Sequence, residues 1–137
     1  MISMVGVLLL AVIVLTPSIS PFRLDQVSKI VASDIEYAKQ NAITTGQTSG
    51  VEFISGGNYT VYQNTTATPL IGPLNEQSMI ISISTLFPGA SITSNYTVEF
   101  DKFGKPTTGG GAGVTISDGS NTKTVFITAN TGRITIQ

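Results

Sequence analysis

The chain has 137 residues, with seven basic and eight acidic side chains and a formal net charge of −1. Charged residues make up 11% of the sequence, against about 25% in typical globular domains, which argues against a basic nucleic-acid-binding surface. The sequence contains neither His nor Cys, so disulfides, the commonest metal ligands and the commonest general base are missing. We therefore expect a structural protein of one domain plus an additional segment, with no enzymatic activity, cofactor or metal site.

An uncharged apolar segment, residues 1–22, precedes the first charged side chain, Arg23. As a helix it would span about 33 Å, close to the roughly 30 Å of bilayer hydrocarbon. We therefore expect a transmembrane or filament-core helix here. A cleaved secretory signal is the alternative, but no basic residue precedes the apolar run, as such a signal requires. The residues expected to contact lipid or neighbouring helices are Val5, Val7, Leu8, Leu9, Leu10, Val12, Ile13, Val14, Leu15 and Pro17.

An amphipathic helix is predicted over residues 23–46, directly after the apolar segment. Its apolar residues recur at three- and four-residue steps and so form one stripe. Gly46 is expected to end the helix, whereas Pro17 and Pro21 fit either a kink in one continuous rod or a break between anchor and domain. The stripe residues, which we expect to pack on a sheet, are Leu24, Val27, Val31, Ile35, Ala38 and Ala42.

Residues 47–137 are predicted to form an antiparallel β domain. Apolar and polar residues alternate in several short runs, which is typical of strands with one buried face, and turn residues such as Gly56-Gly57 and Pro88-Gly89 separate the runs. We expect about seven short strands and the fold class α+β, with one long N-terminal helix, apolar and then amphipathic, packed on antiparallel sheet. The clearest runs are VEFIS, NYTVYQ, NYTVEF, VTIS, TVFIT and RITI.

Two loops contain residues that elsewhere bind ligands. Residues 109–113 are Gly-rich, but a phosphate-binding loop would end in Gly-Lys-Ser/Thr and lead into a helix, and here a strand follows. Residues 118–121 resemble a fragment of a calcium loop, but most of its oxygen ligands, including the bidentate Glu, are missing. We interpret both loops as hairpin turns.

Three segments carry a resemblance to a known family. Ile35–Phe53 resembles, in helix, Gly turn and first strand, the GspH/FimT group of minor pseudopilins and minor pilins within the type IV pilin-like proteins, with Lys39 where that group usually has Arg. Val98–Pro106 is similar to its strand and Phe-x-x-x-Gly-x-Pro turn. Thr124–Ile136 is similar to its closing hairpin, with Thr-Gly-Arg in the turn. Each motif alone is weak, but the three in this order are more specific, and the resemblance extends over essentially the whole chain.

The processing motif of the family is missing from the given sequence. Pilin-like precursors carry a basic leader and then Gly-Phe-Thr-Leu-x-Glu, which is cut after the Gly, so the prepilin cleavage site is absent from this chain. If Pro17 corresponds to the family's helix-kinking proline, Met1 falls just after the missing Glu, and we expect the true start to lie upstream. The alternative takes Met1 as the mature first residue and places Val5 at the Glu position.

The resemblance implies a structural minor pilin or pseudopilin, held in the bacterial inner membrane by a single-pass helix, with its β domain in the periplasm or otherwise on the extracytoplasmic side. Such a subunit joins or initiates the filament of a type II secretion pseudopilus or a type IV pilus. The implied partners are other pilins or pseudopilins of that filament, the inner-membrane assembly platform and, if an upstream leader exists, the prepilin peptidase.

Two other roles lead to different expectations. Some FimT-like minor pilins capture DNA with basic surface residues, but the four basic residues after Gly46 are spread along the sequence among five acidic ones, so we expect no nucleic-acid binding. The rival function is a secreted or membrane-anchored β-sandwich adhesin or binding module that is not built into a filament. That rival predicts a flexible linker near residues 17–21 and no packing of residues 24–42 on the sheet.

Overall fold

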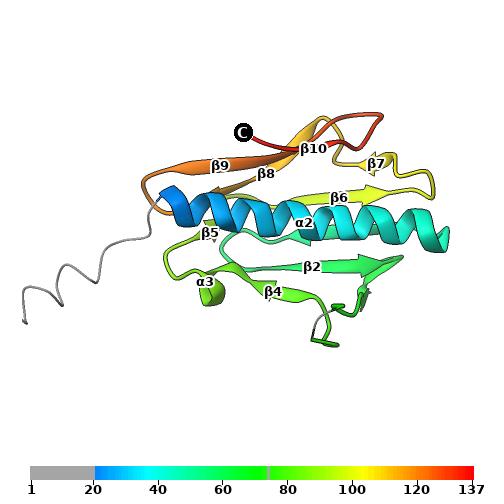
Figure 1. Cartoon of the computed structure of the whole chain (residues 1–137), viewed down its shortest axis with the longest axis horizontal. Coiled ribbons are helices and arrows are strands. Elements are labelled where there is room, and N and C mark those ends of the chain that lie inside the picture. The colour runs from blue at the N-terminus through cyan, green and yellow to red at the C-terminus, as the bar shows by residue number, and fades with distance from the viewer. Residues whose placement is uncertain (1–20, 74) are drawn as a thin grey trace, which may run out of the picture.

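A computed structural model describes residues 21–73 and 75–137 of the chain. The predicted apolar helix segment, with its ten expected contact residues from Val5 to Pro17, lies outside the described residues. Within the described part, no helix is both long enough and apolar enough to cross a membrane. The described residues form one long helix, one short helix and ten strands (Figure 1).

The long helix, α2, extends from Pro21 to Thr45. Its apolar stripe faces the interior along its whole length, because residues three and four positions apart lie on one side of a helix. The helix ends where Gly46 adopts φ +72°, and the Gly46 amide donates to the Ala42 carbonyl at 2.9 Å. This hydrogen bond from the left-handed glycine satisfies the Ala42 carbonyl, one of those that have no partner within the helix at its C-terminal end.

A six-stranded antiparallel sheet lies on one side of the helix. Its order is β3-β2-β1-β6-β7, and β4 also pairs with β2. At its centre Gly50 faces Tyr62 on one neighbouring strand and Glu99 on the other, and an added Cβ at Gly50 would lie 2.3 Å from the Val98 carbonyl oxygen. The strands are β1 (Ser49–Phe53), β2 (Asn58–Gln63), β3 (Thr65–Pro69), β4 (Ile80–Ser82), β6 (Tyr96–Phe100) and β7 (Pro106–Thr108).

A four-stranded antiparallel sheet lies on the other side, in the order β10-β9-β8-β5. Its central hairpin closes through Asp118, whose Oδ1 accepts from the amides of Ser120 at 2.9 Å and Asn121 at 2.7 Å. The loop at 118–121 is thus a hairpin turn that uses the carboxylate to satisfy its own backbone. The strands are β5 (Ser91–Ile92), β8 (Ala112–Ser117), β9 (Thr122–Ile127) and β10 (Ile134–Ile136).

The helix packs on both sheets at once. In Figure 1, α2 crosses the front of the molecule, with β2 and β4 below it and β9 and β10 above it. Its neighbours include β1, β2 and β6 of the larger sheet and β8, β9 and β10 of the smaller one. The core therefore lies between the helix and the two sheets together. The fold-class prediction of α+β, with one long helix on antiparallel sheet, is confirmed.

The predicted number of strands, about seven, was too low. Four strands of the described part lacked an alternating pattern: β3, β4, β5 and β7. β3 is exposed along most of its length and β5 has only two residues, so neither shows apolar residues at every second position. The short helix α3 (Ile83–Leu86) was also not expected. The four strands form because neighbouring strands supply backbone partners, which side-chain periodicity does not reveal.

Candidate functional site

The apolar stripe of α2 is fully buried against the two sheets. Each of its residues is at most 1% exposed, and the larger four bury aliphatic side chains that contribute about 1.5–3 kcal/mol each, or about 6–12 kcal/mol together. This sum is comparable to the net stability of a whole domain, about 5–15 kcal/mol. The helix is therefore a structural part of the domain. The stripe residues are Leu24, Val27, Val31, Ile35, Ala38 and Ala42.

A junction at the C-terminal end of α2 brings together the three segments that resemble the pilin-like family. Lys39 Nζ, from the helix, donates to the Gly132 carbonyl in the turn between β9 and β10 at 3.2 Å. Gly104, in the turn between β6 and β7, lies against Ile43, so that an added Cβ would come within 2.9 Å of its Cδ1 atom. The two turns touch as well, because a Cβ at Gly132 would lie 2.5 Å from the Gly104 carbonyl oxygen.

The two glycines of this junction have backbone conformations that favour glycine. Gly104 has φ +78° and Gly132 has φ +70°, in the left-handed region that side chains disfavour. Asp101 holds the first turn, since its Oδ1 accepts from the amides of Phe103 at 2.9 Å and Lys105 at 3.0 Å. The two turns that resemble those of the family lie about 30 residues apart in the sequence and touch each other. Their contact and their backbone angles explain why both contain glycine.

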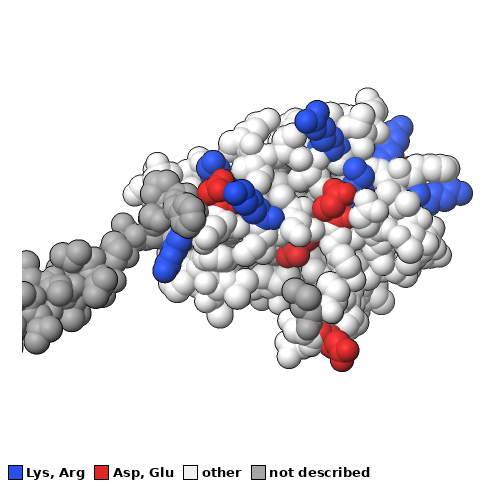
Figure 2. Space-filling model, in the orientation of Figure 1, with Lys and Arg blue, Asp and Glu red and all other residues white. Residues whose placement is uncertain are grey.

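Four basic residues gather at the same junction. Lys102 and Lys105 flank Gly104, Arg133 follows Gly132, and Lys39 contacts both turns. Figure 2 shows positive side chains on the upper right part of this face and a second group at its left, with negative ones at the left, the centre and the lower edge. Three of the four basic residues that follow Gly46 in the sequence therefore lie on two turns that touch, whereas the fourth, Lys123, pairs with Asp25. The fold also places a carboxylate, Asp101, among the basic residues of the junction.

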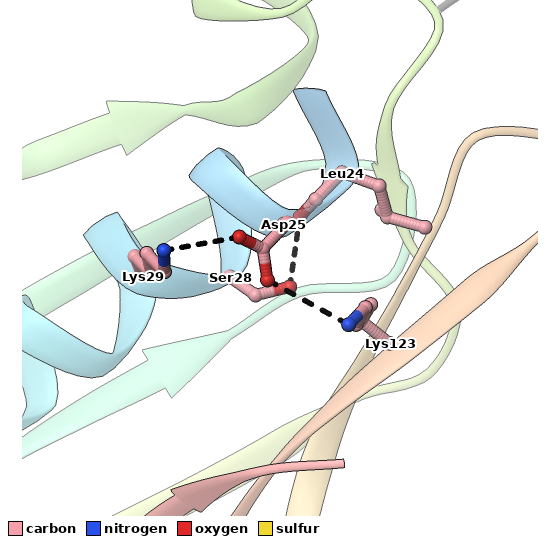
Figure 3. A network of polar contacts seen from close by, with 5 residues as sticks. All are labelled: Leu24, Asp25, Ser28, Lys29 and Lys123. Carbon is pink, nitrogen blue, oxygen red and sulfur yellow. Dashed lines mark hydrogen bonds and ion pairs between the residues drawn. The ribbon is translucent and has the colours of Figure 1, made fainter. Parts of the chain in front are cut away.

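A second polar contact ties the N-terminal part of α2 to β9 (Figure 3). Asp25 lies between Lys29 on the helix, at 3.1 Å, and Lys123 on β9, at 3.6 Å. The hydrogen bond from Lys29 is the main cause that lowers the pKa of Asp25. Below it, the buried Ser28 hydroxyl donates to the Leu24 carbonyl at 2.9 Å, which satisfies it within the helix. These ion pairs are at least partly exposed to solvent, which screens them, and they contribute little stability.

On the side of the larger sheet, the helix carries a half-buried carboxylate that sequence reasoning did not single out. Tyr59 of β2, itself buried, donates its hydroxyl hydrogen to Asp34 Oδ2 at 2.6 Å. Burial raises the pKa of Asp34, and the hydrogen bond from Tyr59 partly offsets the rise. The only signal in the sequence is the position of Asp34 beside the stripe residue Ile35, which directs it toward the edge of the sheet.

A groove of about 360 Å³ lies beside Asp34. We call it the Asp34 groove. One wall is α2 and the other is the segment that leads into β4. Tyr37 spans the gap, since its hydroxyl donates to the Ile71 carbonyl at 3.2 Å. The groove is lined by Ser33, Asp34, Tyr37, Gly72, Pro73, Asn75, Gln77, Ser78, Met79, Ile80 and Ile81.

Asp34→Asn is expected to flatten part of the pH dependence of stability. Because the folded protein raises the pKa of Asp34 above its ordinary value of about 3.9, the unfolded chain ionises first as pH rises. The stability contributed by protonated Asp34 is therefore complete below the unfolded pKa and is lost as pH rises through the folded pKa. The substituted amide cannot ionise, yet its oxygen can still accept from Tyr59.

The measurement is denaturant unfolding between about pH 4 and pH 7, with the wild type as reference so that the other carboxylates cancel. The unfolding free energy of the wild type should fall relative to that of the variant as pH rises. Parallel profiles for the two proteins would show that Asp34 does not titrate with a raised pKa.

Comparison with known proteins assigns the family. A family model described as "Type II transport protein GspH" matches residues 30–132, which is well over half of the chain and contains most of α2, nearly all of both sheets and the glycines of the junction. The chain belongs to the GspH family. This family consists of structural pilin-like subunits and is not a family of enzymes, and the resemblance to the GspH/FimT group is confirmed.

A solved structure supports the same fold for this GspH family member. The crystal structure of the type IV minor pilin FimU from Pseudomonas aeruginosa strain PAO1 superposes with a TM-score of 0.59 at 11% sequence identity, and covers 83% of this chain and 92% of that chain. At this identity the likeness concerns the fold alone. No curated protein matches the chain.

Proposed function

We propose that this GspH family member is a minor pilin or pseudopilin, built into or initiating the filament of a type II secretion pseudopilus or a type IV pilus. Before assembly it is held in the bacterial inner membrane by residues 1–22, with the β domain on the extracytoplasmic side. Its partners are other subunits of the filament and the inner-membrane assembly platform, and the prepilin peptidase if a leader lies upstream. Membership of the GspH family supports this role.

The burial of the α2 stripe is the observation that carries the proposal. A subunit that is pulled from a membrane and stacked through its N-terminal segment must transmit force from that segment to the domain. Here the helix that follows the segment is fixed between both sheets by apolar packing. Asp25–Lys123 and Lys39–Gly132 add polar contacts near the two ends of α2. A load applied before Pro21 would therefore be shared by the whole core.

The rival function, a binding module with a simple anchor, fits the fold less well. It required that residues 24–42 do not pack on the sheet, and these residues form the centre of the core. On that point the rival is wrong.

The test of the proposed function is the fate of the full chain in a bacterium that assembles type II secretion or type IV filaments. We expect the protein in the inner-membrane fraction and, after shearing of the cell surface, in the filament fraction. A variant without residues 1–20 should be missing from both fractions. Recovery of the full chain only in soluble fractions, or in membranes but never with filaments while the other subunits assemble, would contradict the proposal.

A further inference from the structure

The turn between β6 and β7, residues 101–105, projects an aromatic side chain from the junction. Phe103 is 79% exposed, more than any other large apolar residue of the described part. Lys102 Nζ lies 5.3 Å from the centre of its ring, a distance at which cation and ring attract. Asp101 fixes the turn through two backbone amides. We call this preformed projection, which carries an aromatic ring between Lys102 and Lys105, the Phe103 turn.

The Asp34 groove has the opposite chemistry. Met79, Ile80 and Tyr37 provide apolar surface, and Ile80 is 51% exposed. Asp34 uses one carboxylate oxygen for Tyr59, which leaves the other able to accept from a partner. Glu76 is exposed and lies in the chain between Asn75 and Gln77, which both line the groove. Its φ of +56° is strained for a residue with a side chain, as often occurs where a loop is shaped for binding.

The sizes of the two features also correspond. At about 360 Å³, the groove lies near the lower limit of ligand pockets, roughly 300–1,000 Å³. Such a space suits one aromatic ring and a neighbouring side chain better than an extended ligand. The turn carries two lysines, while Asp34 lines the groove and Glu76 lies next to two of its lining residues. Complementary charges of this kind favour the correct partner and register.

We propose that the Phe103 turn of one copy of this chain inserts into the Asp34 groove of a second copy. Phe103 packs against Met79 and Ile80, and the flanking lysines pair with Asp34 and Glu76. This contact goes beyond the proposed function, because it would join two β domains whether or not they belong to a filament.

The contact is made between molecules because one chain cannot make it alone. The Phe103 turn lies beside Ile43 at the end of α2, whereas the groove lies beside Asp34, nine residues or about 13 Å earlier along the helix axis. The turn joins β6 and β7 at one edge of the larger sheet, whereas the groove lies beside β4, which pairs with β2 near the opposite edge of that sheet. Two different surfaces then pair head to tail, so each added copy leaves one turn and one groove free.

Cross-linking of paired cysteine variants tests the geometry. The sequence contains no Cys, so introduced thiols report defined positions. Full-length Lys102→Cys and Ser78→Cys chains with different tags are mixed in mild detergent and treated with a short bismaleimide linker. We expect a mixed dimer. The control replaces the groove partner with Ser120→Cys, an exposed position in the hairpin turn of the other sheet, and should give only background. Equal yields with both partners would overturn the proposal.

A second experiment tests the aromatic ring itself. Phe103→Ala should weaken self-association of the full chain in sedimentation experiments by roughly 30-fold in Kd, as expected for loss of a central aromatic anchor. The same substitution in the Lys102→Cys chain should abolish the mixed dimer. Leu86→Ala, which removes another exposed apolar side chain, should change neither. A monomeric wild type, or an unchanged Kd in Phe103→Ala, would refute the contact.

Discussion

Phe53→Ala is expected to lower the free energy of unfolding by about 3–5 kcal/mol. Phe53 is fully buried in β1, the central strand beneath α2. Its ring lies 5.0 Å from that of Tyr59 and 6.1 Å from that of Tyr96, centre to centre. Truncation removes these aromatic contacts and leaves a cavity under the helix that rigid neighbouring strands cannot fill.

Denaturant unfolding of the full chain in mild detergent measures this loss. Phe103→Ala is the matched control, since it removes the same side chain from a position that is 79% exposed. In dilute protein, below the Kd of the proposed self-association, it should change stability by only about 0.5 kcal/mol. A similar loss for both variants would mean that the helix–sheet core does not provide most of the stability.

Gly132→Ala should destabilise the protein by about 2–5 kcal/mol, the sum of two costs. The left-handed conformation at φ +70° costs an alanine roughly 1–2 kcal/mol. The new Cβ would also lie 2.5 Å from the Gly104 carbonyl oxygen, and relief of such a backbone contact requires a shift worth about 1–3 kcal/mol. Because this contact joins the two turns of the junction, the measured loss of stability tests whether the turns touch at Gly132.

Gly46→Ala separates the two causes. Gly46 has nearly the same backbone angle, φ +72°, but an added Cβ there would meet nothing within 4 Å. Its substitution should therefore cost only the conformational part, about 1–2 kcal/mol. Equal losses at the two glycines, measured by thermal or denaturant unfolding, would show that the turns do not press on each other at Gly132.

The junction gives a physical meaning to the sequence motifs of the family. Three weak patterns, separated along the chain, meet at one contact between the helix end and two turns. Lys39 stands where the GspH/FimT group usually has Arg, and its ammonium group reaches the Gly132 carbonyl. A longer, forked guanidinium could bond several carbonyls at this position. The motif therefore describes how the helix is fixed to the sheets.

From the sequence alone, the elements that could be predicted are those whose apolar residues recur with a regular period. The stripe from Leu24 to Ala42 repeats at helical spacing, and the strands β1, β2, β6, β8 and β9 alternate, because one side of each enters the core. β10 alternates in sequence although its three residues are only partly buried. Gly46 and the turn at 118–121 were recognisable because local backbone geometry requires these residue types. Such signals arise within a few residues, so a single sequence contains them.

The remaining features arise from contacts between elements that are distant in the sequence. β3, β4, β5 and β7 form because neighbours offer backbone partners. The bond from Lys39 to Gly132 spans 93 residues, and that from Tyr59 to Asp34 spans 25. The Asp34 groove and the gathering of four basic residues depend on how two sheets meet one helix. These contacts depend on the relative placement of whole elements, which periodicity along the chain does not specify.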